Sequence, residues 1–153
     1  MSQEQRWSFL ERHHEIAVST VNRDGVIYSS PVWYTVKDKR IYLGIDQASH
    51  HLKNTEGGSS MTGVVFDGGN DLATARGVQI QGRGEVLEDK ELAKECDERI
   101  ADSIFGPGHP HIESYREYRN YYDHLIIELK PEKMITWDMR KLYHLQVYTS
   151  RKL

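Results

Sequence analysis

The segment from residue 15 to residue 45 constrains the fold of this chain more than any other. Three runs rich in β-branched and aromatic residues are separated by two polar turns, in the order EIAVSTV, NRDG, VIYSSPVWYTV, KDKR and IYLGI. Asn, Asp and Gly supply the backbone angles that tight turns require, so successive strands reverse direction. The segment therefore predicts a three-stranded antiparallel meander.

More strands and several helices are expected around this meander. SMTGVVFD and GVQIQGRGEVLE predict two strands on either side of the glycine-rich loop GGNDLATAR. From Asp89, apolar residues recur every four positions as far as Ile104, which predicts an amphipathic helix that ends at the FGP sequence. A first helix with Ser2 as N-cap is expected over residues 2–11, and a further helical piece over HIESYREYRNYY.

The last third of the chain completes the expected sheet. HLIIEL is predicted to be a strand, KPEK a turn, MITWD a strand and LYHLQVYT a final strand. Six or seven antiparallel strands with alternating faces suit a small closed or nearly closed barrel, because closure removes exposed strand edges. We find no repeat and no linker, so residues 1–153 are expected to form one domain.

Composition excludes several functional classes. Twenty Lys and Arg stand against 23 Asp and Glu, and the basic residues are scattered, so nucleic acid is not expected as a partner. The single Cys96 excludes an intramolecular disulfide and a multi-cysteine metal site. No apolar stretch approaches the ~20 residues that cross a bilayer, and MSQEQRWSFLERHH lacks the apolar core of a signal peptide. A cytoplasmic protein without a membrane segment is expected.

The polar turn after the third strand, DQASHHLKN, is a candidate anion site. If Ser49 caps a short helix that begins near His50, the free N–H groups of the first turn point outward. The Ser49 hydroxyl and the side chains of His50, His51 and Lys53 could then converge on a phosphate. The alternative is a Ser-capped helix with solvated histidines, which is the commoner explanation of such a stretch.

Two other groups of residues favour a structural explanation. Tyr115, Tyr118 and Tyr122 repeat at helical spacing, which favours packing against the barrel over stacking on a substrate. His109 and His111 flank a proline and have no third ligand beside them, so no metal site is expected.

The order of these motifs resembles the pyridoxamine 5'-phosphate oxidase-like family of flavin-binding proteins. The likeness is carried by four segments: AVSTVNRDGVIYSSPVWYTVKDKRIYLGIDQASHHLKN, GVVFDGG, RGVQIQGRGEVLED and LIIELKPEKMITWD. The resemblance implies a mainly β fold with helices, namely an FMN-binding split β-barrel of six to seven antiparallel strands with a Greek-key-like order. It also implies a homodimer that binds FMN, or the deazaflavin coenzyme F420, in a cleft between the two barrels.

The resemblance assigns candidate cofactor residues by position. It places Ser30, Val32 and Trp33 beside the isoalloxazine ring, and Ile45 near the cofactor. The phosphate would be met by Ser49, His50 and His51, where the family usually has Ser followed by Arg and Lys; Lys53 is the candidate for restoring one charge. Trp137 is a candidate to cover the cofactor, with a place in the core or the dimer interface as the alternative.

The functional hypothesis follows from this resemblance. The tail WDMRKLYHLQVYTSRKL lacks the arginine and histidine motif that grips the substrate phosphate in true pyridoxamine-phosphate oxidases. We therefore expect an FMN- or deazaflavin-dependent oxidoreductase that transfers a hydride to or from a small organic substrate, and we assign no catalytic side chain, because the cofactor carries the chemistry. The alternatives are a haem-binding or haem-utilisation protein on the same fold, suggested by eight histidines, and a non-catalytic flavin-binding protein.

Overall fold

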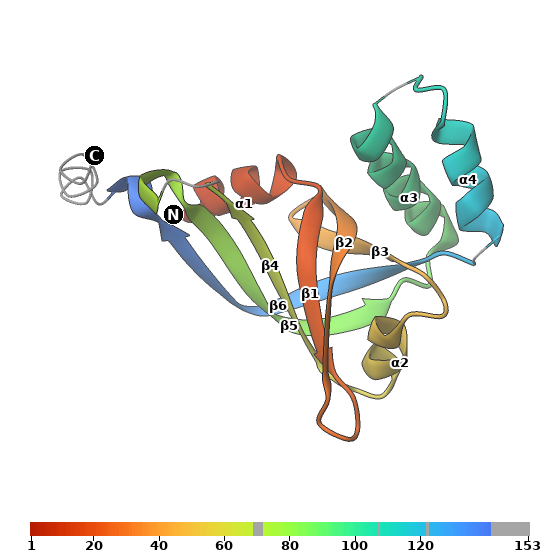
Figure 1. Cartoon of the computed structure of the whole chain (residues 1–153), viewed down its shortest axis with the longest axis horizontal. Helices are drawn as coiled ribbons and strands as arrows, with labels where there is room; N and C mark the ends of the chain where they lie inside the picture. The colour runs from red at the N-terminus through yellow and green to blue at the C-terminus, as the bar shows by residue number, and fades with distance from the viewer. Residues whose placement is uncertain (69–71, 107, 122, 142–153) are drawn as a thin grey trace.

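A barrel of six antiparallel strands dominates the computed structural model, which describes residues 1–68, 72–106, 108–121 and 123–141 (Figure 1). The strands are β1 (Glu15–Val21), β2 (Ile27–Lys37), β3 (Arg40–Ile45), β4 (Ser60–Asp67), β5 (Arg76–Val86) and β6 (Leu125–Asp138). Their order around the barrel is β1-β2-β3-β6-β5-β4, and β4 pairs with β1 to close it. Because β4 returns beside β1, the first four strands form a Greek key. The predicted mainly β barrel is confirmed.

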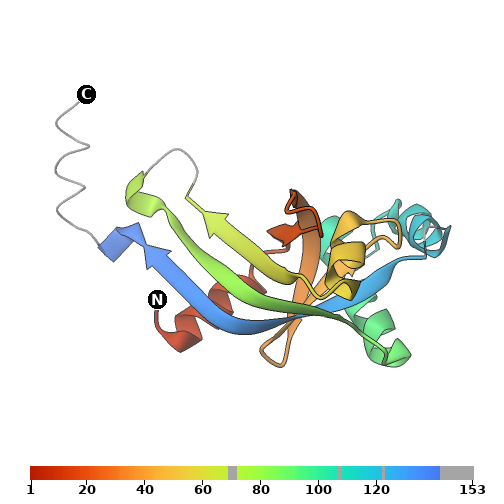
Figure 2. The same cartoon turned by 90° about the horizontal axis from the view of Figure 1, so that it is seen from below.

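In the described residues, four α-helices surround the barrel and divide between its two ends. They are α1 (Gln3–Glu11), α2 (His50–Glu56), α3 (Lys90–Phe105) and α4 (Ile112–Tyr121), with the short 3₁₀ helices η1 (Leu72–Thr74) and η2 (Met139–Lys141). Figures 1 and 2 show α1, η1 and η2 toward one end of the long axis and α2, α3 and α4 toward the other. Ser2 caps α1 in a capping box with Gln5, as the sequence predicts.

The core fills the barrel and extends under one helix. Alternate residues of β1, such as Ile16 and Val18, point inward, as a half-buried strand requires. Leu10 of α1 is buried in the same cluster and accepts a 2.7 Å hydrogen bond from the Tyr34 hydroxyl at its carbonyl oxygen. A second buried cluster lies under α3 and consists of Tyr42, Cys96, Ile100 and Ile126. The four-residue spacing of apolar residues in α3 therefore reflects its buried face.

The predicted turn KPEK is wrong, because β6 runs through it without a break. The pairing of β5 with β6 shifts at this point: Gln81 lies opposite Lys133, and Gly82 lies opposite Pro131. Glu132 is the extra residue of a β-bulge, which is one of the few places where a strand accepts a proline. A Cβ on Gly82 would come within 2.0 Å of the Lys130 carbonyl oxygen, so this approach of the two strands requires glycine. The other predicted strand, LYHLQVYT, lies outside the described residues.

The barrel opens between β2 and β3 at the end where α2 lies. Their register runs only from Tyr34 opposite Leu43 to Lys37 opposite Arg40. The earlier part of β2 continues its pairing with β1, from Trp33 opposite Glu15 to Ile27 opposite Val21. One edge of this part of β2 therefore turns away from its partner and borders the opening.

Candidate functional site

A cavity of about 370 Å³ occupies the opening between β2 and β3. We call it the Ser30 cavity. Its lining residues come from β2, the end of β3, the start of α2, and α4 with the turn after it: Ser30, Pro31, Val32, Trp33, Gly44, Ile45, Asp46, Ser49, His51, Tyr115, Tyr118 and His124. An adjoining hollow of about 390 Å³ shares four of these residues and adds Tyr28, Ser29, Ala48 and His50.

The structure brings most of the predicted cofactor residues to this one place. Ser30, Val32, Trp33, Ile45, Ser49 and His51 all line the Ser30 cavity, and His50 lines the adjoining hollow. The Val32 and Ile45 side chains are buried in the barrel core, whereas the Trp33 ring is 40% exposed. Residues distant in sequence thus lie around one cavity.

Two predicted residues lie elsewhere. Lys53 borders a different hollow, with Asn22 and Gly57, on another side of α2. Trp137 lies near the far end of β6, where a Cβ on Gly77 would come within 2.1 Å of its ring. Leu125, at the start of β6, pairs with Ile45 beside the cavity, so roughly 40 Å of strand separates Trp137 from it.

A buried hydrogen-bond chain ends at Ser30. The Asn54 amide donates a 3.0 Å hydrogen bond to the Thr20 hydroxyl oxygen. The same Thr20 oxygen lies 3.0 Å from Nδ1 of His51. Nε2 of His51 lies 2.9 Å from the Ser30 hydroxyl oxygen. His51 is only 4% exposed, and its burial, followed by the charge of His50, lowers the pKa of its imidazole. His51 is therefore neutral near pH 7, and both of its ring nitrogens are engaged.

The chain favours one direction of donation. The Thr20 oxygen accepts from Asn54, which leaves its own proton for Nδ1 of His51. A neutral imidazole that accepts at Nδ1 carries its proton on Nε2 and donates it to Ser30. The Ser30 hydroxyl proton is then left for an acceptor in the cavity.

The turn that begins α2 has the predicted cap, and its two histidines differ. The Ser49 hydroxyl oxygen accepts from the backbone N–H of His51 at 3.1 Å, so Ser49 is the N-cap, as the sequence predicts. His50 is exposed, and its ring stacks on Tyr28 with centroids 4.2 Å apart. The alternative prediction for this segment is a Ser-capped helix with two solvated histidines. It holds for His50, which is exposed, but is wrong for His51, which is buried.

The sequence did not point to the wall formed by α4. Tyr115 and Tyr118, which we expected to pack against the barrel, line the Ser30 cavity, and Tyr122 lies outside the described residues. Burial raises the pKa of the Tyr115 phenol, which stays protonated. The Arg119 guanidinium lies over the Tyr115 ring at 5.1 Å and forms ion pairs with Asp97 and Glu98 of α3. These contacts fix α4 against α3 and so hold the tyrosines in place.

His124 completes this wall. Its Nδ1 lies 3.1 Å from the Asp97 carboxylate, and its Nε2 lies 3.9 Å from the Asp46 carboxylate at the cavity. A Cβ on Gly44 would approach the His124 ring within 2.7 Å, so glycine makes room for the imidazole. The only sequence signal for this arrangement is the glycine at the end of the third strand, which alone is too common to identify a site.

In residues 1–68, 72–106, 108–121 and 123–141, no helix is long and apolar enough to cross a membrane. Over the same residues, no group of three His, Cys, Asp or Glu side chains could hold a metal ion.

The closed six-stranded barrel with an opening beside β2 defines the class as the split β-barrels. The chain belongs to the pyridoxamine 5'-phosphate oxidase family, whose sequence profile matches residues 2–138. No curated protein matches the chain significantly.

Solved structures share the fold at low sequence identity. A conserved hypothetical protein from Mycobacterium tuberculosis has a TM-score of 0.80 and 22% identity, over 93% of this chain and 88% of that protein. The heme storage protein HutZ from Vibrio cholerae has a TM-score of 0.66 and 15% identity, over 87% of this chain and 92% of that one. The FAD binding protein from Mycobacterium smegmatis has a TM-score of 0.59 and 9% identity, over 90% and 94%. At such identities the similarity shows the fold alone.

Proposed function

We propose that this chain is an oxidoreductase that binds FMN, or a deazaflavin, with the cofactor ring in the Ser30 cavity, and transfers a hydride to or from a small organic substrate. The observation that carries the proposal is the meeting of six predicted cofactor residues, from β2, β3 and the start of α2, around one cavity. Family membership supports the same cofactor class. A bound flavin would supply the hydride chemistry, and the protein would supply position and hydrogen bonds.

The cavity suits a flat ring with polar edges. The exposed Trp33 ring offers an aromatic surface, and the edge of β2 beside the opening offers backbone groups. The Ser30 hydroxyl, oriented by His51, adds a donor for one acceptor atom of the ring. These residues would bind and orient the ring, while Tyr115 and Tyr118 of α4 would limit its contact with water.

The phosphate end offers fewer charges than the resemblance implies. Among the residues that line the Ser30 cavity and the adjoining hollow, none is Arg or Lys. Ser49 and the exposed His50 are the side chains available to a phosphate, since His51 is neutral and already bonded at both nitrogens. We therefore propose that the ring contributes more to affinity than the phosphate. His50→Lys should then tighten FMN binding, and an unchanged dissociation constant would place the phosphate elsewhere.

We propose that a second copy of the chain covers the open face of the cavity. Trp33 lines the Ser30 cavity and is 40% exposed, so part of the cavity's aromatic wall is uncovered in a single chain. Trp137, at the far end of β6, would reach a cofactor only from the partner of a homodimer. Sedimentation should show a dimer, and a monomer that binds flavin tightly would contradict this.

Fluorescence tests the proposed ring position. Flavin added to the apoprotein should quench tryptophan emission, and Trp33→Phe should remove much of this quenching. Trp7→Phe is the matched control, because Trp7 lies on the buried face of α1 and outside the cavity. Equal loss of quenching in both variants would refute the position. Steady-state turnover with a nicotinamide or reduced deazaflavin donor would then separate an enzyme from a non-catalytic flavin-binding protein.

Haem binding is the second candidate, and His124 is the observation that favours it. Its Nδ1 is held by Asp97, and a carboxylate that fixes one imidazole nitrogen in this way prepares the other to bind iron. HutZ, the heme storage protein with the same fold, supports this alternative. Added haemin should then give a Soret band that His124→Ala shifts or abolishes. If instead the purified protein is yellow and bleaches with reductant, the flavin proposal stands.

A further inference from the structure

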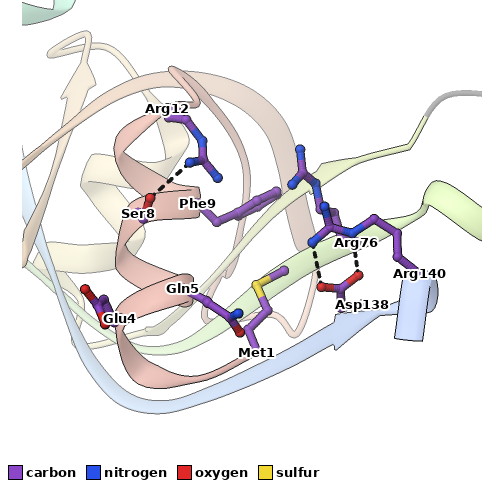
Figure 3. A pocket seen from close by; sticks show the side chains of 9 residues that line it. All are labelled: Met1, Glu4, Gln5, Ser8, Phe9, Arg12, Arg76, Asp138 and Arg140. Carbon is purple, nitrogen blue, oxygen red and sulfur yellow. Dashed lines mark hydrogen bonds and ion pairs between the residues drawn. The ribbon is translucent and has the colours of Figure 1, made fainter. Parts of the chain in front are cut away.

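A second cavity, of about 550 Å³, is lined by residues of α1, β5, β6 and η2 (Figure 3). We call it the Arg76 cavity. Arg76 pairs with Asp138 at the last residue of β6, whereas Ile45 of the Ser30 cavity pairs with Leu125 at the first, so the two cavities lie at opposite ends of the barrel. Three segments that are distant in sequence each contribute one arginine to its lining: Arg12 from the end of α1, Arg76 from the start of β5 and Arg140 from η2. The barrel thus brings three permanent positive charges to one concave surface.

Two of the three guanidinium groups are held in place by other contacts. Arg76 donates from Nε and Nη2 to one Asp67 oxygen, at 3.2 and 2.6 Å, and its guanidinium lies over the Phe9 ring at 5.3 Å. Arg140 donates from Nε and Nη2 to the two Asp138 oxygens, at 2.8 and 2.7 Å. A ligand that bound here would not have to order these side chains, which lowers the cost of binding.

The balance of charge at the cavity leaves one arginine without an acidic partner. Asp67 and Asp138 are paired with Arg76 and Arg140, and these guanidinium groups lower the pKa values of both carboxyls. Within the described part of the chain, Arg12 forms no ion pair and donates only to the Ser8 hydroxyl, at 3.0 Å. The other acidic residue of the lining, Glu4, points away from the guanidinium groups in Figure 3.

We propose that the Arg76 cavity binds the oxyanion group, a phosphate or a carboxylate, of a small organic ligand between Arg12, Arg76 and Arg140. A guanidinium presents parallel N–H donors that match both oxyanions, and Arg12 keeps most of its donors for such a contact. The volume is sufficient for a small organic anion. This site is separate from the Ser30 cavity and does not depend on the flavin proposal.

Calorimetric titration at low salt and pH 7.5, with inorganic phosphate and with succinate as the two probes, tests the proposal. The wild type should bind at least one probe saturably. Arg12→Gln should weaken that binding about tenfold or more, because it removes a charge-assisted contact. Arg12→Lys should lose less affinity for the probe, because lysine keeps the positive charge and lacks only the parallel N–H donors of the guanidinium. Displacement of one probe by the other would show that a single oxyanion site takes both, and binding of one probe only would name the group.

Arg83→Gln is the matched control. Arg83 lies on β5, as Arg76 does, but it is exposed, pairs with Glu132 and lies outside the cavity. It should bind the probe as the wild type does. The proposal is overturned if the wild type binds neither probe, if Arg12→Gln keeps wild-type affinity, or if Arg83→Gln weakens binding as much as Arg12→Gln. Circular dichroism and the unfolding midpoint establish that each variant is folded.

Discussion

The two ends of the barrel hold their polar groups in different ways. At the Ser30 cavity, Thr20, His51 and Asn54 are buried and joined by hydrogen bonds between neutral groups. At the Arg76 cavity the groups are charged: Arg76 and Arg140 form ion pairs with Asp67 and Asp138, each pair has one well-exposed member, and Arg12 donates to the Ser8 hydroxyl. Burial explains the difference, because a neutral side chain with its hydrogen bonds made loses little on leaving water, whereas a buried charge loses much.

The polar groups at one end of the barrel should therefore contribute mainly to folding stability, and those at the other end mainly to the binding of charged ligands. The neutral chain through His51 couples β1, β2 and α2, so its loss should be felt in folding. The ion pairs at the other end remain in contact with water and are screened, so their loss should be felt mainly by a charged ligand. Substitutions at the two ends of the barrel should therefore differ in their effects on stability.

The largest effect is expected from His51→Leu. This change leaves the Thr20 and Ser30 hydroxyls without their imidazole partner, and Thr20 is fully buried. Leaving the buried Thr20 hydroxyl unsatisfied costs about 1–3 kcal/mol, and the lost hydrogen bond to the exposed Ser30 hydroxyl adds about 1 kcal/mol, so the free energy of unfolding should fall by roughly 3 kcal/mol in urea denaturation. His50→Leu, one position earlier and exposed, is the control and should change stability little. Similar losses in the two variants would contradict a buried network.

Each end of the barrel has a glycine packed against an aromatic ring, so the cost of adding a methyl group can be compared between the two ends. At the Arg76 end, Gly77→Ala would place a Cβ 2.1 Å from the Trp137 ring, and at the Ser30 end, Gly44→Ala would place one 2.7 Å from His124. The closer contact should cost more, about 2 kcal/mol for Gly77→Ala, because the indole ring must leave its site. The unfolding midpoint and a red shift of tryptophan emission measure this. A larger loss for Gly44→Ala would reverse the expected order.

A smaller effect concerns the pH dependence of stability at the His51 end. Since the folded pKa of His51 lies below its unfolded value, the unfolded chain binds more protons just below that value, ~6.5. The wild type should therefore lose stability as the pH falls from about 7 toward 5, and His51→Gln should lose less. The other histidines are common to both proteins and cancel in the comparison. Parallel pH profiles would mean that His51 titrates equally in both states.

The sequence predicted those parts of the fold that local patterns determine. The meander over residues 15–45 and the helix after Asp89 follow from periodicity and turn residues, and the structure confirms them. The bulge at Gly82 could not be predicted, because KPEK is a good local turn sequence and only its pairing with β5 keeps it extended. Tertiary contacts decided this segment against its local preference.

The candidate site was also predictable only where local sequence motifs determine it, and not where tertiary contacts do. The resemblance located Ser30 and Ser49, but it gave no sign that Thr20, 31 residues before His51, would bond to its ring. Helical geometry could have separated Lys53 from His51, because residues two apart on a helix do not face each other. The place of Tyr115 at the cavity could not be predicted, because it depends on the docking of α4 against α3. Arg119 holds α4 there through ion pairs with acidic residues of α3, and no local pattern connects those residues to the site.

The smallest effect on stability is expected from Asp67→Asn at the Arg76 end. Asp67 pairs with Arg76 at the surface, and that guanidinium, with a smaller effect from His13, holds the pKa of the carboxyl low. Its folded pKa lies below the unfolded value of ~3.9, so this pair stabilises the fold above that pH and ceases to do so as the pH falls through the folded pKa. Because exposed ion pairs contribute little, the wild type and the variant should differ little near pH 7, and they should converge as the pH falls below the folded pKa of Asp67.

That convergence lies well below the pH range in which His51 acts, so acid titration of the unfolding midpoint separates the two ends of the barrel. Asp67→Asn also removes a negative charge from beside Arg76 and weakens the two hydrogen bonds that its guanidinium donates there, because a neutral amide oxygen replaces a carboxylate oxygen. Phosphate binding at the Arg76 cavity should then tighten although stability scarcely changes. Unchanged phosphate affinity would show that Arg76 does not face the anion. A loss of stability near pH 7 as large as that of His51→Leu would show that the two ends do not differ in the way proposed here.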